Sequence, residues 1–549
     1  MSVQLHVNHR TCDAPAGGSL FDYATSVGVQ VPTSCNKQGR CKECVVEVTE
    51  GMERLSERVP AEQHLKGAFR LSCCTRVIAD EGTVRCHTMR RGEMRIEKHA
   101  FALPVQRQAW QLDPAVTRDG ERILLDGQEI ARSPGAMHGL AIDLGTTTVV
   151  IRLLNLETGE VIADSSFENP QRFGGSDVMA RIQYDTEDRT KTLQRTLVGY
   201  LSHAIQELPV DPQSIYEVVL AGNSTMRDLF FRLSVYSIGQ SPYRSITELE
   251  LAEGKRATTS LAVEAKRLGL PIHPKARVYG LPIISGHVGA DAAACMLAVD
   301  LAHEERTVAI MDIGTNTELI VGNKHRVLAA SCPAGPAFEG GQITFGMPGL
   351  PGAIEKVAIA EGGAVRVGVI GDGAPEGLCG SGLVDLLGEL LRTGRINALG
   401  RFEHGPEEFV VAQGADQPVT FSEADINALA QAKGANVAGL QIAFAEYGIR
   451  PADLEVFYLA GGFGRHLNIE SAKRIGLIPN LPAERILQVG NASVEGACIA
   501  LLSRTKRAEL EQLVRRVTHC RLETHPGFFD FFVEGCQFGP VGGVEVSEP

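Results

Sequence analysis

Two short segments, 169 residues apart, follow one pattern and constrain the fold of most of the chain. Each is an apolar strand that ends in an aspartate, a Gly-Thr turn, and a second strand. The segments are residues 141–149 (Ala-Ile-Asp-Leu-Gly-Thr-Thr-Thr-Val) and residues 310–318 (Ile-Met-Asp-Ile-Gly-Thr-Asn-Thr-Glu). A repeated supersecondary unit indicates two related halves, which we expect to face one another.

The repeated turns have the chemistry of a phosphate site. A tight turn exposes successive backbone N–H groups, and glycine lets the backbone approach phosphate oxygens closely. A carboxylate at the strand end can hold Mg²⁺ through its water shell. We therefore predict Asp143 and Asp312 as the catalytic, magnesium-positioning residues. The predicted contacts with ATP are Gly145, Thr146, Thr147, Gly314, Thr315 and Asn316. A single turn of this kind is more often an ordinary hairpin, so the prediction depends on the duplication.

A third glycine-rich turn follows the apolar run 456–459. Its sequence is Ala-Gly-Gly-Phe-Gly, and Gly461, Gly462 and Gly464 would allow close approach of the adenosine. The alternative for these glycines is a turn that packs a strand against a helix. Two Asp-x-Gly-Thr turns followed by this segment favour a nucleotide site.

Cysteines gather near the N-terminus, where six of the thirteen lie from Cys35 to Cys86. The spacing Cys35-x5-Cys41-x2-Cys44, followed by Cys73, supplies four thiolates from one loop and a neighbouring segment. Iron–sulfur clusters are held by cysteine thiolates, and such short spacings let one loop wrap a compact cluster. The pattern predicts a [2Fe–2S] site, with a left-handed backbone at Gly39 inside the wrap.

Two other interpretations of these cysteines stay open. Structural zinc commonly uses two close cysteine pairs, whereas three of these cysteines are close together and the fourth is distant. A reactive Cys-x-x-Cys should begin a helix, whereas Cys44 runs into an apolar, strand-like segment. Residues 70–73 (Arg-Leu-Ser-Cys) resemble the closing motif of adrenodoxin-type ferredoxins, which implies Cys73 as the fourth ligand rather than the adjacent Cys74.

The chain is long enough for several domains of roughly 100–200 residues each. Together with the family resemblances given below, the sequence implies a [2Fe–2S] ferredoxin domain over residues 1–88, a linker domain over 89–138, a middle region with the first ATPase lobe over 139–305, and a C-terminal ATPase lobe over 306–549. The first is expected to be a small α+β (β-grasp) domain, and the α/β pattern begins after Gly139. Amphipathic spacing predicts helices from 192 to 208 and from 422 to 448.

Charge and hydropathy exclude some classes of protein. Residues 1–138 have a formal charge of +1 and the rest of the chain has −14, which argues against nucleic acid as a partner of the larger part. No run of about 18 apolar residues predicts a membrane span. The first ten residues lack the basic start and apolar middle of a signal peptide, so we expect a cytoplasmic protein.

The two turns and the glycine-rich segment resemble the actin/Hsp70/sugar-kinase ATPase superfamily, which implies a two-lobed α/β fold that binds Mg-ATP. Further segments make the resemblance narrower, because together with the cysteine loop they are similar to the reductive activators of corrinoid enzymes. These segments are residues 168–182, 221–226, 289–291, 334–340, 379–382 and 489–493. The resemblance covers essentially the whole chain.

This resemblance implies an ATP-dependent activator that returns one electron from its [2Fe–2S] cluster to an inactive Co(II) corrinoid and so restores Co(I). The implied cofactors are the cluster, ATP and Mg²⁺. The implied partners are the corrinoid protein of a methyltransferase or demethylase system and an external electron donor, with a homodimer favoured and neither nucleic acid nor membrane involved.

Other functions stay open at this stage. The chain could activate another low-potential metalloenzyme, although activators of radical dehydratases lack an N-terminal ferredoxin domain. It could be a non-enzymatic redox-sensing or docking module with inert ATPase lobes, or a small-molecule kinase with a redox-regulatory domain. Cys379, in Cys-Gly-Ser-Gly, could be a nucleophile, but a glycine-rich loop before the apolar run 383–391 is favoured.

Overall fold

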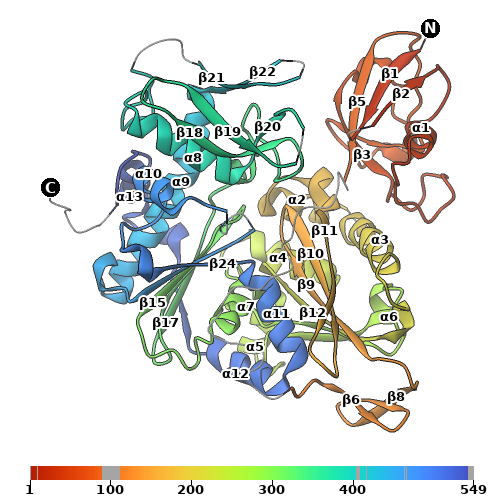
Figure 1. The fold of residues 1–549 in the computed structure, drawn as a ribbon. Coiled ribbons are helices and arrows are strands. Elements are labelled where there is room, and N and C mark those ends of the chain that lie inside the picture. Colours follow the sequence, from red (N-terminus) through yellow and green to blue (C-terminus); the bar gives the residue numbers. More distant parts are fainter. Residues whose placement is uncertain are drawn as a thin grey trace. The chain divides into compact units, whose positions relative to one another are not determined.

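The computed structural model describes residues 2–8, 10–89, 112–188, 190–371, 373–403, 408–415, 417–462, 464 and 466–541. It divides into two compact units. Among the described residues, the first unit holds those up to 89 together with 114–281, and the second holds 112–113 together with those from 282 onward. Figure 1 shows the elements in sequence colours. Over the residues described, no helix is long and apolar enough to cross a bilayer.

The first unit begins with a five-stranded sheet in the order β2-β1-β5-β3-β4 (Figure 1). Val3, Leu5 and Val7 alternate with polar residues along the first strand, and all three are buried. A short helix, α1 (Leu20–Ser26), begins where Ser19 caps it by accepting the backbone N–H of Asp22. The strands are β1 (Val3–Val7), β2 (Arg10–Ala14), β3 (Val45–Glu50), β4 (Phe69–Leu71) and β5 (Thr83–Thr88). The predicted α+β ferredoxin fold is confirmed.

The predicted linker has more structure than its sequence suggests. Residues 116–132 form a three-stranded antiparallel sheet of β6 (Val116–Asp119), β7 (Arg122–Leu125) and β8 (Gln128–Arg132). These strands are only four or five residues long, and β7 is a continuous apolar run after Arg122, so the sequence shows little alternation with a period of two. Residues 90–111 of the predicted linker lie outside the described residues.

A six-stranded sheet forms the centre of the remainder of the first unit, in the order β11-β10-β9-β12-β14-β13. Strands β9 to β11 are antiparallel neighbours, and β9, β12 and β14 run parallel. The strands are β9 (His138–Leu144), β10 (Thr148–Asn155), β11 (Val161–Glu168), β12 (Ile215–Gly222), β13 (Leu261–Glu264) and β14 (Arg277–Gly280). The helices are α2 (Val178–Glu187), α3 (Thr192–Gln206), α4 (Ser224–Phe230), α5 (Ile246–Ala252) and α6 (Ala265–Leu268).

The second unit repeats the topology of five of these strands, and the sixth strand, β25, lies beside β17 at the opposite edge from the one that β13 occupies. Its main sheet has the order β24-β23-β15-β16-β17-β25, in which β15 to β17 are antiparallel and β15, β23 and β24 are parallel. The predicted relation between the two halves is therefore confirmed, with β9 and β10 equivalent to β15 and β16. The strands are β15 (Val308–Asp312), β16 (Thr317–Gly322), β17 (Val327–Cys332), β23 (Val456–Ala460), β24 (Ile486–Gly490) and β25 (Val517–His519).

An inserted region between β17 and β23 distinguishes the second unit. It contains the sheet β19-β18-β20, the hairpin β21-β22 and two helices. Its elements are β18 (Ala353–Ile359), β19 (Val365–Val369), β20 (Gly377–Leu378), α8 (Gly380–Arg392), β21 (Glu408–Gln413), β22 (Pro418–Ser422) and α9 (Glu423–Tyr447). The other helices are α7 (Ala290–Ala298), α10 (Ile469–Ile475), α11 (Ala492–Leu502), α12 (Arg504–Val514) and α13 (Phe528–Gly535).

Asp113 ties the described end of the predicted linker to the second unit. Its carboxylate accepts hydrogen bonds from the Ser503 hydroxyl, and from the Thr505 backbone N–H (3.0 Å) and hydroxyl (2.8 Å), at the start of α12. The predicted domain boundaries stay predictions. The division of the structure into compact units falls after residue 281.

Helix α9 begins and ends where its sequence predicts. Ser422 accepts the Asp425 backbone N–H at 3.2 Å, Asp425 accepts the Ser422 N–H at 2.9 Å, and the helix ends at the left-handed Gly448. This capping box satisfies backbone groups that the first helical turn leaves without partners.

We expect Ser422→Ala to lower the free energy of unfolding of the second unit by about 1 kcal/mol, because the N-terminal cap is lost. Urea unfolding followed by circular dichroism would measure this. The exposed Asn427 on the same helix provides the control, since Asn427→Ala should raise helix propensity and leave stability equal or slightly higher. Equal stability of wild type and Ser422→Ala would contradict the capping role.

Candidate iron–sulfur and nucleotide sites

The pairing of β3 with β4 brings two of the predicted cluster ligands together. Val45 lies opposite Leu71, so Cys44 and Cys73 flank the same end of this ladder. Their Sγ atoms are 3.3 Å apart, and the Ser72 backbone N–H donates to the Cys44 carbonyl at 2.9 Å. This pair of thiols is placed to share one iron of a cluster.

The other two predicted ligands lie in the loop between α1 and β3. Cys35 is hydrogen-bonded to the Cys41 side chain and to backbone groups of the loop, including Arg40. Although burial opposes it, these bonds lower the pKa of the Cys35 thiol to about 7, which favours the thiolate that binds metal. Gly39 has φ +67°, as predicted, and a Cβ there would lie 2.8 Å from the Cys74 Sγ. The loop thus wraps tightly around the space that a cluster would fill.

The fourth ligand is the one ambiguous position. Cys73 is buried against Cys44, whereas Cys74 is half-buried with its Sγ 3.7 Å from that of Cys73. The hydrogen bond with Cys44 and burial raise the pKa of the Cys73 thiol, and burial raises that of the Cys74 thiol, so the pKa values do not distinguish the two. The geometry favours Cys73, as the sequence does, and the ligand set stays a prediction.

A buried carboxylate supports the segment that carries Cys73. The Glu62 side chain is fully buried and pairs with Arg70 at 2.9 Å. The same carboxylate accepts the Leu71 backbone N–H at 2.9 Å and the Thr75 hydroxyl at 3.1 Å, on either side of the cysteine pair. Burial opposes ionisation, but Arg70 and the backbone donors outweigh it and hold the pKa of Glu62 below its usual range. Sequence reasoning missed this residue.

Helix α3 packs against the cluster loop. Three of its side chains donate to loop carbonyls: Arg195 to Arg40 (3.3 Å), Thr196 to Lys42 (3.3 Å) and Tyr200 to Val45 (3.5 Å). A Cβ at Gly199 would lie 2.4 Å from the Glu43 side chain, so only glycine fits at this point. The spacing of these residues along one helix face is visible in the sequence, but their partner is not.

The first Asp-x-Gly-Thr turn connects β9 with β10 and is held by buried polar side chains. Asn169 donates to the Gly145 carbonyl at 2.8 Å, and Arg181 donates to the Thr146 carbonyl at 2.6 Å. Asn223 donates to the Thr146 hydroxyl at 2.9 Å. Asn169 and Arg181 belong to the segment 168–182, and Asn223 belongs to the segment 221–226. Both segments that the sequence singled out therefore support this turn. They leave Asp143 and Thr147 half-buried at the end of the sheet.

The second turn connects β15 with β16 and lies among carboxylates. Asp312 ends β15, and Thr315 donates its hydroxyl to Glu339, which lies in the segment 334–340 that the sequence singled out. Burial, Asp291 and Asp312 together raise the pKa of Glu318 well above its usual value. A cluster of like charges is what a bound cation would offset, so these residues fit Mg²⁺. Sequence reasoning did not select Glu318 or Asp291 as site residues, although both lie in motifs that it noted.

The glycine-rich segment after β23 approaches Asp312 closely. Gly461 has φ +107°, and a Cβ there would lie 2.4 Å from the Ile313 carbonyl oxygen and 3.1 Å from the Asp312 Oδ1. A Cβ at Gly464 would lie 2.7 Å from the Ala460 carbonyl, whereas one at Gly462 would meet open space. The structure thus brings Asp312, Thr315 and Gly461 together in the second unit. Asp143 and the first turn belong to the other unit.

Cys379 does not have the surroundings of a nucleophile. It is buried at the start of α8, where its Sγ contacts the Ile354 carbonyl oxygen at 3.4 Å, and burial raises its thiol pKa. The first turn of α8 is Gly380-Ser381-Gly382, which agrees with the glycine-rich helix start that the sequence favoured. A Cβ at Gly382 would lie 2.1 Å from the Ile354 carbonyl oxygen, so the glycine serves packing.

Separate replacement of Cys73 and Cys74 decides the fourth ligand. We expect Cys73→Ser to lose the visible absorption of the cluster and its iron and acid-labile sulfide, because no other thiol pairs with Cys44 as closely. Cys74→Ser should keep all three. Loss of the cluster from Cys74→Ser with retention in Cys73→Ser would reverse the assignment.

Glu62→Gln should weaken the support of the Cys73 segment. Breaking a buried ion pair on one side costs roughly 3–5 kcal/mol, since the remaining charge is left buried. We therefore expect a lower urea midpoint for loss of the cluster absorption. Glu57→Gln, at an exposed position of the same loop, is the matched control. An unchanged midpoint in Glu62→Gln would show that the pair does not support the site.

Comparison with known proteins places these sites in a family. The model "RACo middle region" matches residues 138–304, and "C-terminal domain of RACo the ASKHA domain" matches residues 306–543. A 2Fe–2S iron–sulfur cluster binding domain matches residues 4–77, which include all four predicted ligands. The two RACo models together match more than half of the chain.

Similar proteins agree with the family models. The corrinoid activation enzyme RamQ of Eubacterium limosum is 28% identical, over 98% of this chain and 99% of its own. A [Co(II) methylated amine-specific corrinoid protein] reductase of Methanosarcina barkeri is 24% identical, over 72% of this chain and 76% of its own. The solved structure of a reductive activator for a corrinoid, iron–sulfur protein is 28% identical, covers 98% of both chains and superposes with a TM-score of 0.72. The chain belongs to the RACo family, with an N-terminal [2Fe–2S] domain before the family's middle region and ASKHA domain.

Proposed function

We propose that this chain is an ATP-dependent reductive activator that passes one electron from its [2Fe–2S] cluster to the inactive Co(II) corrinoid of a methyl-transfer protein and so restores Co(I). The observation that carries this proposal is the presence, in one chain, of four cysteines on a loop and a neighbouring segment and of two Asp-x-Gly-Thr turns. Similarity over nearly the full length to proteins named for corrinoid activation supports it.

The cysteine loop suits a one-electron carrier. A [2Fe–2S] cluster bound by four thiolates supplies one-electron chemistry at a low potential, about −400 mV in plant-type ferredoxins. Cys35 and Cys41 would hold one side, and Cys44 and Cys73 the other. Gly39 and the buried Glu62 keep the loop and the β4 segment close enough for this.

The nucleotide turns provide the means to drive an unfavourable transfer. Backbone N–H groups at Gly145–Thr147 and Gly314–Asn316 would bind phosphates, and Asp312 with Asp291 and Glu318 would hold Mg²⁺. Asp143 has the equivalent position in the first unit. Gly461, Gly462 and Gly464 leave room for the adenosine. ATP can drive the transfer only if it binds two conformations of the complex with different affinities.

The proposal also includes the partner, the electron donor, the oligomeric state and the cellular location. The partner is the corrinoid protein of a methyltransferase or demethylase system, and an external donor reduces the cluster. A homodimer and a cytoplasmic location complete it. Activation of another metalloenzyme and a purely redox-sensing role are the alternative outcomes of the test below.

The test follows cobalt by anaerobic absorption spectroscopy. A Co(II) corrinoid protein is mixed with this protein, a reductant and Mg-ATP, and we expect Co(I) to appear. Cys41→Ser should abolish this through loss of the cluster. Asp312→Asn should abolish it while the cluster absorption stays, because only the cation site is changed. Cys12→Ser and Asp530→Asn, outside both sites, are the matched controls and should behave as wild type.

Two outcomes would reject parts of the proposal separately. If Cys41→Ser yields Co(I) as fast as wild type, the electron-transfer role is wrong. If omission of ATP makes no difference, the ATPase role is wrong, and the redox module with inert lobes is favoured.

A further inference from the structure

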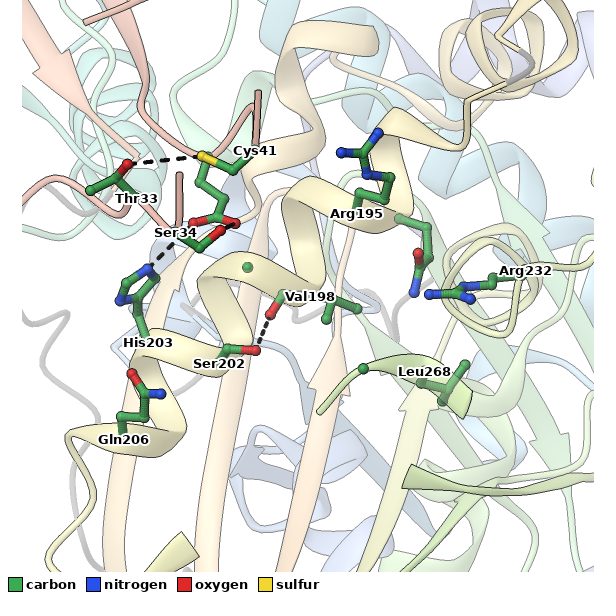
Figure 2. Close-up of a pocket in the computed structure, with 14 residues that line it drawn as sticks. Thr33, Ser34, Cys41, Arg195, Val198, Ser202, His203, Gln206, Arg232 and Leu268 are labelled. Atoms are coloured by element: carbon green, nitrogen blue, oxygen red, sulfur yellow. Dashed lines mark hydrogen bonds and ion pairs between the residues drawn. The ribbon is translucent and has the colours of Figure 1, made fainter. Parts of the chain in front are cut away.

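A cavity of about 540 Å³ lies beside the cluster loop, within the first unit. One wall is helix α3, the second is the loop with Thr33, Ser34 and Cys41, and the third carries Arg232 and Leu268 (Figure 2). This volume is typical of small-molecule sites. Because Cys41 is a predicted cluster ligand, a molecule in the cavity would lie directly against the cluster loop.

The charged side chains of the cavity favour an anion. Arg195 and Arg232 are exposed at its wall, and among the described residues neither forms an ion pair. Glu43 is the acidic side chain of the lining. Its carboxylate accepts the Ser34 hydroxyl and lies 3.5 Å from the His203 Nε2. Arg195 also donates to the Arg40 carbonyl at 3.3 Å, but no carboxylate neutralises either guanidinium among the described residues. Both can therefore bind a carboxylate or a phosphate, which guanidinium groups recognise through paired hydrogen bonds.

A buried amide in the lining also indicates a ligand. Gln194 is 1% exposed, and neither atom of its side-chain amide has a hydrogen-bond partner in the described chain. Leaving such a group unpaired costs roughly 1–3 kcal/mol. Val198, which follows it on the same face of α3, and Leu268 add apolar surface (Figure 2). A small organic anion with both donor and acceptor atoms would satisfy all these groups.

We propose that this cavity binds a small organic anion of carboxylate or phosphate chemistry, and that an anionic one-electron reductant delivers its electron to the cluster here. The donor loses one electron and the oxidised cluster gains it, with no bond formed or broken and no proton moved. The inference rests on the proposed function, because it takes Cys41 as a cluster ligand.

The first experiment measures binding with citrate, a redox-inert probe. Isothermal titration of the oxidised holoprotein at fixed ionic strength should give saturable binding. Arg232→Glu should weaken it roughly tenfold or more, through loss of a charge-assisted hydrogen bond. Arg267→Glu is the control: it makes the same charge change at an exposed position of α6, outside the lining, and should bind citrate as wild type does.

Gln194→Leu separates a ligand-binding role from a structural one. Removing a buried amide that has no partner should leave the melting temperature equal or higher, whereas citrate should bind more weakly. A lower melting temperature with unchanged citrate affinity would show that the amide supports the fold and does not meet a ligand.

The second experiment compares two donors of opposite charge by stopped-flow bleaching of the cluster. The SO₂ radical anion, formed from dithionite, should reduce the wild-type cluster several-fold faster than that of Arg232→Glu, and citrate should compete with it. Reduced methyl viologen, a cation, should be no slower with the variant. If Arg267→Glu slows the reduction as much as Arg232→Glu does, the rate difference comes from the overall electrostatic field of the protein, and the cavity has no specific role.

The outcomes distinguish this inference from the proposed function. Absence of citrate binding to wild type, or equal donor rates in wild type and Arg232→Glu, would overturn the cavity's role while Co(II) reduction could still proceed. Loss of Co(I) formation in all assays, with citrate bound normally, would instead reject the proposed function.

Discussion

The first nucleotide turn depends on hydrogen bonds to its backbone from side chains far along the chain. A turn that presents N–H groups to phosphate must direct its carbonyls elsewhere, and a buried carbonyl without a partner is costly. Asn169 and Arg181 satisfy the carbonyls of Gly145 and Thr146, and Asn223 fixes the threonine hydroxyl. Rigidity in this turn is therefore a property of the whole first unit, and the turn can be organised before a nucleotide binds.

The second turn meets the same need in another way. Gly335 donates its backbone N–H to the Thr315 carbonyl at 2.9 Å, and the segment after β23 packs against Asp312 through Gly461. The first turn has the guanidinium of Arg181 beside it, whereas carboxylates lie beside the second turn. One of them, Glu318, is buried on β16. One topology thus supports two unlike environments: a turn held by an arginine and two asparagines in one unit, and an acidic turn, suited to a cation, in the other.

Local patterns predicted the strands, turns and helix ends correctly because their causes are local. Ser19 and Ser422 cap helices through residues three positions away, and the duplicated turns repeat a sheet topology that their sequence already implies. Long-range features could not be predicted in this way. The partner of α3, the burial of Glu62 and Glu318, and the cavity around Gln194 arise only when distant segments pack together. Strands as short as β6 to β8 carry little periodicity, and spacing alone does not rank the adjacent Cys73 and Cys74.

The contact of Asp113 with the start of α12 has a consequence for the order in which the chain can fold. Its partner Ser503 lies 390 residues later, with the whole Pro114–Leu281 segment of the other unit between them. At a synthesis rate of about 5–20 residues per second, roughly 20 to 80 s pass on the ribosome between the two. During that interval the ferredoxin strands and the first main sheet can form, while Asp113 and its neighbours await the last part of the chain. The second unit therefore contains residues that are synthesised before the 114–281 segment and residues that are synthesised after it. A nascent chain that stops before α12 cannot complete this unit.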